Sequence, residues 1–356
     1  MQKTLKPKPI FFIFIIAIAL IVISLVCIFL TSPVNSRDTK EIDVEISNGT
    51  STLKIGTILK EKNIIRSKLA FNIYVKLHNV NNLKAGTYKL NRSMNLNKVI
   101  KTLEKGSNYN PNLVVLTFKE GERITDYVKI IASKTNNTQD EIINIINDEN
   151  YLKELINEYW FLTNDILTPG IYYPLEGYIA PDTYHYENKD VTVKEIFKKV
   201  LDEEEKKLEP YKADLQSKNI HEVMTMASIV ELEGTNSENR KMIVGVFNNR
   251  LNSGYNMGSD VTTYYGLQVP MTKDLTTAQF NTVNKYNTRT NAMIGKLPIS
   301  PISTPSLSSI DATLHPTNNN YLFFVADKNG KIYYSRTNSE HDAKIAEIKR
   351  NGDWIW

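Results

Sequence analysis

Two glutamates at the end of an apolar helical segment are the first residues that could carry out chemistry. The segment runs from His221 to Gly234, and its apolar residues recur with the spacing of a buried helix face: Val223, Met226, Ala227 and Val230. Glu231 and Glu233 flank this face about 200° apart, so they cannot point into one small site together. A carboxyl group at the margin of an apolar face is partly desolvated, which raises its pKa toward the range of a general acid. Spacing alone favours a solvated or ion-paired glutamate and does not choose between the two.

Three polar segments after this helix have a composition that suits a carbohydrate-binding groove. They are 256–266, 286–290 and 296–305, and they follow a second predicted helix that begins near Asn236 or Ser237. Their amide and hydroxyl side chains can bond to sugar hydroxyls, and tyrosine rings can cover the apolar faces of sugars. The same composition fits loops that proline stiffens, and composition does not decide between the two interpretations.

The elements that must position these residues are indicated by a change of composition along the chain. Glycine, proline and tyrosine become frequent from Pro169 onward, with a polar cluster at 174–184. We therefore expect a mixed α/β catalytic domain over 161–356, within a chain of α+β class.

A local pattern occurs twice before this domain. Glu45–Gly49 leads into a helix-like stretch, and Thr117–Gly121 leads into another. The repeat predicts two small related α/β modules, at 42–106 and 107–160, the second including a helical connector. Neither module contains a constellation of catalytic residue types, so we interpret them as a scaffold or as carbohydrate-binding modules.

An uncharged apolar run near the N-terminus predicts a membrane anchor. Residues 10–30 contain no charge and no proline, and this length is close to the roughly 20 residues of a transmembrane helix. Lysines precede the run, so the positive-inside rule places residues 1–9 in the cytoplasm as a short tail. Residues 31–41 form a tether, and the rest lies outside the cytoplasm. The alternative is a cleaved signal peptide, but Thr31-Ser32-Pro33 is a poor cleavage site.

The composition argues against several classes of function. The 356 residues carry a net charge of +4 without a dense block of Lys or Arg, so we expect no nucleic-acid partner. The single cysteine, Cys27, rules out an intrachain disulfide and a cysteine-based metal site. The five histidines are scattered without the spacing of a zinc helix, so we expect no metal and no cofactor.

With these features in place, the chain resembles the membrane-anchored endolytic murein transglycosylase family. The resemblance covers nearly the whole outer chain. It rests on five ordered motifs: Leu175–Tyr178 with Pro181–Tyr184, Ala227–Glu231, Phe247–Leu251, Tyr286–Thr288 and Tyr321–Ala326. The repeated strand–glycine–helix segments also fit, since the family carries LysM-like modules before its catalytic domain.

The resemblance implies a specific reaction. The family cuts the β-1,4 bond from N-acetylmuramic acid to N-acetylglucosamine in nascent peptidoglycan and leaves a 1,6-anhydro end. The muramic acid's own C6 hydroxyl is the nucleophile, so one carboxyl group suffices as acid and then base, where a hydrolase usually needs two. The family's catalytic glutamate is placed on Glu231. The implied substrate-binding residues are Glu176, Asp182, Tyr184, Glu233, Asp260, Thr262, Asn287 and Thr288.

The family's role in ending glycan strands makes peptidoglycan synthases of the elongation or division machinery candidate partners. The chain departs from the family pattern in three segments. Gly258 stands in place of glutamine and Val261 in place of proline, Arg289 stands in place of tyrosine, and the segment 296–302 reads Lys-Leu-Pro-Ile-Ser-Pro-Ile in place of Gly-Leu-Pro-Pro-Gly-Pro-Ile. These departures concern substrate contacts more than the type of reaction.

Two alternatives remain. The first is a muramidase that uses water, with Asp260 or Glu176 as a second carboxylate. The second is a non-enzymatic scaffold that binds the cell wall, which the repeated modules and the anchor would support.

Overall fold

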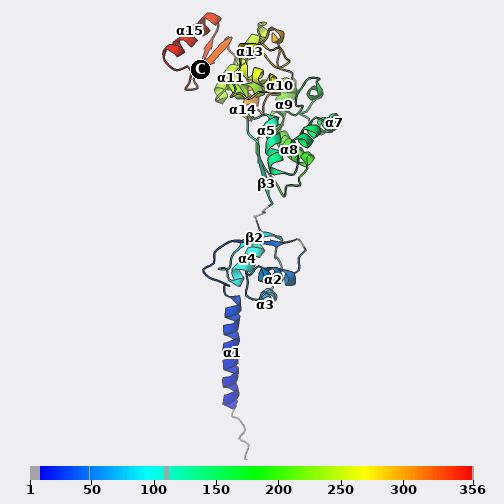
Figure 1. The fold of residues 1–356 in the computed structure, drawn as a ribbon, viewed down its shortest axis with the longest axis vertical. Coiled ribbons are helices and arrows are strands. Elements are labelled where there is room, and N and C mark those ends of the chain that lie inside the picture. Colours follow the sequence, from blue (N-terminus) through cyan, green and yellow to red (C-terminus); the bar gives the residue numbers. More distant parts are fainter. Residues whose placement is uncertain (1–8, 48, 108–111, 355–356) are drawn as a thin grey trace, which may run out of the picture. The chain divides into compact units, whose positions relative to one another are not determined.

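The protein has two compact units, at residues 1–112 and 113–356, in a computed structural model that describes residues 9–47, 49–107 and 112–354 (Figure 1). Each unit contains helices together with two-stranded antiparallel sheets. The predicted α+β class is therefore confirmed.

The first unit is a small α/β module preceded by a helix. Its elements are α1 (Pro9–Thr31), β1 (Ile42–Ile46), α2 (Thr52–Glu61), α3 (Lys68–Leu77), β2 (Gly86–Leu90) and α4 (Leu96–Lys105). Strands β1 and β2 pair antiparallel, and the helices pack on a core that includes Leu59, Phe71 and Val99. Ser51, Ser67 and Asn95 cap the three module helices by accepting hydrogen bonds from backbone N–H groups in the first turn.

Helix α1 covers the predicted anchor, and its described large apolar side chains are exposed, from Phe14 to Phe29. Counted over the described part of the chain, no helix combines the length and the apolar composition needed to cross a membrane. The anchor at 10–30 stays a prediction, and so does the LysM likeness of the modules.

The second unit begins with a strand pair that brings distant segments together. Its first elements are β3 (Val114–Thr117), α5 (Ile124–Lys134), α6 (Gln139–Ile146), α7 (Glu149–Glu158), η1 (Asn164–Leu167), β4 (Thr183–Tyr186), α8 (Val193–Leu208), η2 (Glu209–Tyr211) and α9 (Lys212–Gln216). Strand β3 pairs antiparallel with β4, and Leu116 lies opposite Tyr184.

This pairing changes the predicted division of the chain. One core contains residues from Val114 to Leu314, so 107–160 and 161–356 share packing rather than forming separate domains. The predicted repeat is present locally: Gly49 and Gly121, both with positive φ, link β1 to α2 and β3 to α5. The boundary between compact units lies at 112/113 and not at 160/161.

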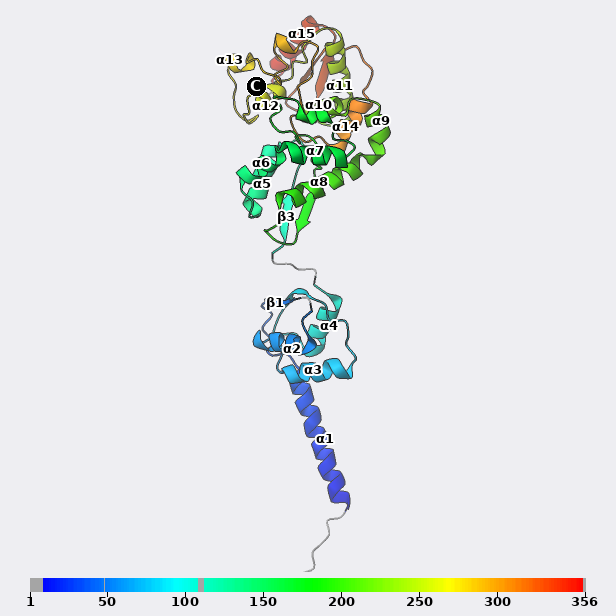
Figure 2. The same ribbon diagram turned by 90° about the vertical axis from the view of Figure 1, so that its right-hand side faces the viewer.

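The rest of the second unit surrounds a buried helix (Figure 2). Its elements are α10 (Ile220–Glu233), α11 (Ser237–Asn252), α12 (Asp260–Gly266), α13 (Thr277–Phe280), η3 (Asn291–Met293), α14 (Leu307–Leu314), β5 (Phe323–Ala326), β6 (Ile332–Ser335) and α15 (Asn338–Arg350). Helix α10 is buried from Ile220 to Val230 except at the exposed Glu222, and it packs against α11, α12 and α14. It therefore carries both predicted glutamates at one end of a rigid central element.

Candidate active site

The two glutamates of α10 lie in different environments. Both lie in the last turn of α10, which ends at Glu233, and Gly234 is the C-cap residue. Because they are two residues apart, their side chains point to different sides, as the helix geometry predicts.

Protein groups donate hydrogen bonds to both carboxyl oxygens of Glu231. Its Oε1 accepts a hydrogen bond from Nη2 of Arg240 at 2.8 Å, and its Oε2 accepts from the Ser306 N–H at 2.9 Å. The hydroxyls of Ser306 and Ser309 also donate to Oε2, at 2.5 and 2.7 Å. The side chain is only 7% exposed. Glu231 thus joins α10 to α11 and to the start of α14, where its negative charge is favoured by the helix dipole.

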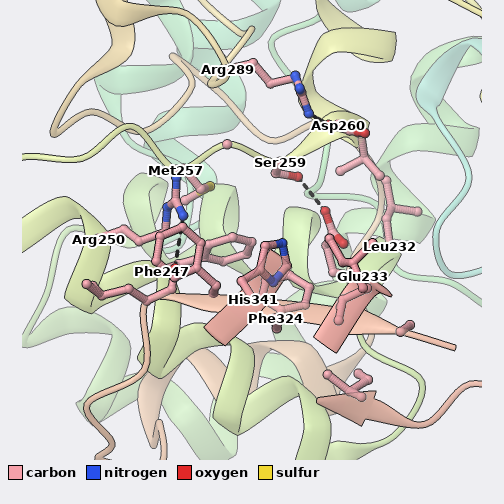
Figure 3. Close-up of a pocket in the computed structure, with 18 of the residues that line it drawn as sticks. Leu232, Glu233, Phe247, Arg250, Met257, Ser259, Asp260, Arg289, Phe324 and His341 are labelled. Carbon is pink, nitrogen blue, oxygen red and sulfur yellow. Dashed lines mark hydrogen bonds and ion pairs between the residues drawn. The ribbon is translucent and has the colours of Figure 1, made fainter. Parts of the chain in front are cut away.

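Glu233 lines a cleft of about 730 Å³, whereas Glu231 is not among the described residues that line it (Figure 3). The Ser259 hydroxyl donates to Oε1 of Glu233 at 2.6 Å. Burial raises the pKa of Glu233 from its ordinary 4.5 to about 7; the Ser259 hydrogen bond opposes this rise and the nearby Asp260 charge adds to it. A carboxyl group with this pKa exists in both protonation states near neutral pH, which acid–base catalysis requires.

The walls of the cleft come from six elements, α10, α11, α12, β5, β6 and α15, and from the segments around them. One wall is the turn from Met257 to Val261, and the opposite wall includes Phe323 and Phe324 of β5. Arg250 of α11 links the two, because it donates to the carbonyl oxygens of Asn256 at 2.8 Å and Leu322 at 3.0 Å. Aromatic and apolar side chains thus face a small set of polar groups, as in many ligand sites.

Three of the predicted binding residues hold the turn that carries Ser259. Thr262, Asn287 and Thr288 are fully buried. The Thr288 hydroxyl accepts from the Ser259 N–H at 3.1 Å and lies 2.8 Å from the Thr262 hydroxyl. Asn287 accepts from the Thr263 hydroxyl at 2.7 Å. Since these polar groups are satisfied within the protein, they position Ser259 rather than line the cleft.

Asp260 lies at the rim of the cleft and forms an ion pair with Arg289 (Figure 3). Both side chains are about half exposed, so the pair contributes little to stability. Arg289 also lies over the ring of Phe280, 4.9 Å from its centroid. The arginine that departs from the family pattern therefore supplies the partner of the rim carboxylate.

Glu176, Asp182 and Tyr184 lie outside the described cleft lining. Glu176 is buried and accepts from the Ile124 N–H at 3.0 Å and the Tyr265 hydroxyl at 3.1 Å. Burial raises the pKa of Glu176 to about 8. Asp182 pairs with Lys207 at 3.0 Å, and this hydrogen bond lowers the pKa of Asp182. The prediction that these three residues bind substrate is not supported by their positions.

Tyr184 lies in the hydrophobic core. It is 4% exposed on β4, and its hydroxyl donates to the carbonyl oxygen of Ala180 at 2.9 Å. A buried tyrosine whose hydroxyl is satisfied by the backbone stabilises the fold and has no free group for a ligand.

Sequence reasoning missed several residues of the cleft. Arg250 lies within the motif Phe247–Leu251 and Ser259 within the polar segment 256–266, but neither was singled out. His341 and Trp354 line the cleft from the C-terminal region, and no sequence pattern pointed to them. Among the described residues, no group of three or more His, Cys, Asp or Glu side chains is placed to hold a metal ion.

Two described relatives and one solved structure are similar to this chain. A protein of Bacillus subtilis (strain 168), described as an endolytic murein transglycosylase, is 32% identical over 88% of this chain and 86% of its own. A protein of the same description from Streptococcus pneumoniae serotype 2 is 31% identical over 88% of this chain, which spans 60% of that relative. A crystal structure of a yceG-like protein from Listeria monocytogenes has a TM-score of 0.61 and 33% identity, covering 85% of this chain and 99% of that one.

A family model matches residues 44–347, which takes in most of the first unit's module and nearly all of the second unit, including the described cleft lining except Trp354. With this match and the identities above, the chain belongs to the YceG-like family.

Proposed function

We propose that this chain is an endolytic murein transglycosylase that cuts glycan strands of peptidoglycan between N-acetylmuramic acid and N-acetylglucosamine and leaves 1,6-anhydro ends. The observation that carries the proposal is Glu233, a carboxyl group with a pKa of about 7 that lines a large cleft. The names of the relatives support the same reaction class.

We assign the catalytic role to Glu233 in place of Glu231, the residue that we predicted from sequence. Both Glu231 oxygens accept hydrogen bonds from protein donors, Arg240 on Oε1 and Ser306 on Oε2, and Glu231 is not among the described residues that line the cleft. Glu233 accepts one hydrogen bond from Ser259 and faces the cleft, where a glycosidic oxygen can reach it.

The reaction balances with one carboxyl group. Protonated Glu233 gives its proton to the glycosidic oxygen as the bond from that oxygen to C1 of muramic acid breaks. The C6 hydroxyl of the same sugar attacks C1 and closes the anhydro ring, and its proton passes to the Glu233 carboxylate. The acid is regenerated, no water is consumed, and the aromatic walls of the cleft help to keep water away from C1.

The water-using muramidase remains the second candidate because Asp260 lines the same cleft as Glu233. The buried position of Glu176 removes it as the second carboxylate. Asp260 would have to act while paired with Arg289, which stabilises its charge but holds it at the rim.

Mass analysis of digested peptidoglycan separates the two reactions. The transglycosylase leaves products that are one water lighter than the reducing ends of a muramidase. A digest that contains only reducing ends would refute our proposal, and an Asp260→Asn variant that loses all activity while still folded would favour the muramidase.

The proposal also includes the cellular location of the enzyme and its partners. We propose that residues 10–30 anchor the chain in the cell membrane with the N-terminus in the cytoplasm, and that residues after 31 face the wall. The absence of charge in 10–30 and the exposed apolar side chains of α1 support this. LysM-like modules that contact glycan, and peptidoglycan synthases as partners, belong to the same proposal.

A further inference from the structure

Helix α3 in the first unit has apolar side chains on two opposite faces. Phe71 and Val75 are buried in the core of the module. Leu69, Ile73 and Leu77 are 65%, 49% and 74% exposed. The spacing of four residues places these three on one stripe, and the helix geometry places that stripe about 180° from the core face. We call Leu69, Ile73 and Leu77 the apolar stripe.

The beginning of α3 is fastened to the end of α1. The guanidinium of Arg66, just before α3, donates to the carbonyl oxygen of Pro33 at 2.7 and 3.0 Å and to that of Val34 at 3.1 Å. It also lies over the ring of Phe29, 4.5 Å from the centroid. Both views show α3 beside the end of α1, on the side of the module where α1 leaves it (Figures 1 and 2). The apolar stripe therefore continues the exposed apolar surface of α1.

The charged side chains of α3 itself have one sign. Lys68 and Lys76 are exposed on α3, and the helix contains no Asp or Glu. A second copy of this helix would place like charges against each other. An anionic lipid surface offers an apolar layer for the stripe and negative headgroups for the lysines. Charge and continuity with α1 thus favour a membrane surface over a second copy of the chain.

We infer that α3 lies in the lipid–water interface of the membrane that α1 is proposed to cross, with the apolar stripe at the boundary of headgroups and acyl chains. The inference rests on the proposed anchor. Two contacts with the bilayer, one across it and one along its surface, would fix the orientation of the first module on the membrane. A single spanning helix would leave the module free to rotate and tilt.

The test uses the full chain in lipid nanodiscs that contain anionic lipid, with an environment-sensitive fluorophore on one cysteine. The first sample is labelled at the native Cys27 within α1. The second is Ile73→Cys with Cys27→Ser, which labels the stripe. The matched control is Lys101→Cys with Cys27→Ser, because Lys101 is exposed on α4 of the same module. Lipids brominated at shallow or deep acyl positions serve as quenchers.

We expect the label at position 73 to show blue-shifted emission and quenching by shallow bromines. The label at Cys27, three residues before the end of the proposed span, should also be quenched by brominated lipid, and the label at 101 by neither kind. Adding Leu69→Ser and Leu77→Ser should abolish the quenching at 73, because the remaining surface no longer favours the interface.

Three other outcomes would each overturn the inference, and the measurements distinguish them. If Cys27 is quenched and position 73 behaves like 101, the anchor stands and α3 does not touch lipid. If neither Cys27 nor 73 is quenched, the anchor and the inference both fail. If 73 is blue-shifted without lipid quenching, and the shift weakens on dilution, a second copy of the protein covers the stripe.

Discussion

At the residue scale, the hydrogen bond from Ser259 to Glu233 should set the pH range of activity. The hydroxyl donates to the carboxylate at 2.6 Å and lowers a pKa that burial raises to about 7. Glu233 must be protonated to begin the reaction, so activity falls as the pH rises through this pKa. In Ser259→Ala the pKa of Glu233 rises further, because the charged form loses a donor.

The falling limb of the kcat/KM–pH profile for Ser259→Ala should therefore move upward by about one pH unit, the effect of a charge-assisted hydrogen bond. Rates of product release from solubilised glycan strands, measured by chromatography from pH 5 to 9, provide the profile. Ser259→Thr, which keeps the hydroxyl, should restore the wild-type limb. A profile that is identical in all three proteins would show that Ser259 does not act on the catalytic carboxyl.

The two glutamates of α10 should have opposite effects on stability. Because burial raises the pKa of Glu233, the folded state disfavours its charge and loses stability as the pH rises from about 4.5 to about 7. Glu233→Gln removes this cost, so the variant should be more stable than wild type at pH 8 and equal to it at pH 4. Thermal unfolding at the two pH values measures the difference.

Glu231→Ala should instead lower the free energy of unfolding by about 3–5 kcal/mol, because it leaves the buried Arg240 charge without its partner. The exposed fractions of the two side chains, 7% and 14%, make solvent a poor replacement. Chemical denaturation at pH 7 gives the value, and a change below 1 kcal/mol would refute the structural role of Glu231.

At the scale of elements, the turn before α12 is held by side chains that never enter the cleft. The Thr288 hydroxyl accepts a hydrogen bond from the Ser259 N–H at 3.1 Å, and the Gly258 N–H donates to the Thr288 carbonyl oxygen at 3.0 Å. Gly258 itself has a φ of +74°, a conformation that glycine adopts without strain. The glycine that replaces the family's glutamine thus suits the backbone of this turn.

Thr288→Val should reduce both stability and activity by displacing Ser259. The isosteric change leaves the buried Ser259 N–H without its acceptor, at a cost of about 1–3 kcal/mol. Activity should fall with the pH profile shifted in the direction of Ser259→Ala. A stable variant with an unshifted profile would mean that the turn is held by other contacts.

The sequence predicted helix α10 well because its cause is local. The apolar periodicity from Val223 to Val230 and the stop at Gly234 are both present in the structure. Helix spacing does not decide between Glu231 and Glu233, because the choice depends on which distant segments approach each side of the helix. Ser306 lies 75 residues from Glu231, and Ser259 lies 26 residues from Glu233. Helix spacing carries no information about either approach.

The predicted substrate-binding residues show the same limit, because their surroundings also depend on distant segments. Asp260 lines the cleft, and Thr262, Asn287 and Thr288 lie together behind it. Glu176 belongs to a different contact, because Ile124 and Tyr265 enclose it. Polar residue types in an ordered motif indicate a shared fold but do not distinguish a side chain that touches substrate from one that supports it.

At the scale of the whole molecule, the pairing of β3 with β4 makes residues 113–160 part of the catalytic unit. The core that they share includes Leu116, Tyr127 and Ile131 from the first segment and Phe161 and Tyr178 from the second. Residues that face each other in β3 and β4, such as Thr117 and Thr183, are 66 residues apart in the sequence, and so distant a pairing has no local sequence pattern. For this reason we predicted the boundary near 160.

Residues 113–356 produced alone should unfold in one cooperative transition, whereas residues 161–356 should fail to fold. The shorter chain loses β3, α5, α6 and α7 and exposes the apolar surface that they cover. Circular dichroism during heating distinguishes the two. A cooperative transition in the shorter chain would restore the predicted boundary at 160/161.

The most direct test of the central claim compares the activities of Glu233→Gln and Glu231→Gln at pH 7 on purified peptidoglycan, with folding of both checked by thermal unfolding. We expect Glu233→Gln to lose about 10²–10⁴-fold in the rate of anhydro-end formation, the usual contribution of a general acid. Glu231→Gln, in the fraction that remains folded, should keep most of its activity. A folded Glu231→Gln protein without activity, beside an active Glu233→Gln protein, would contradict the assignment.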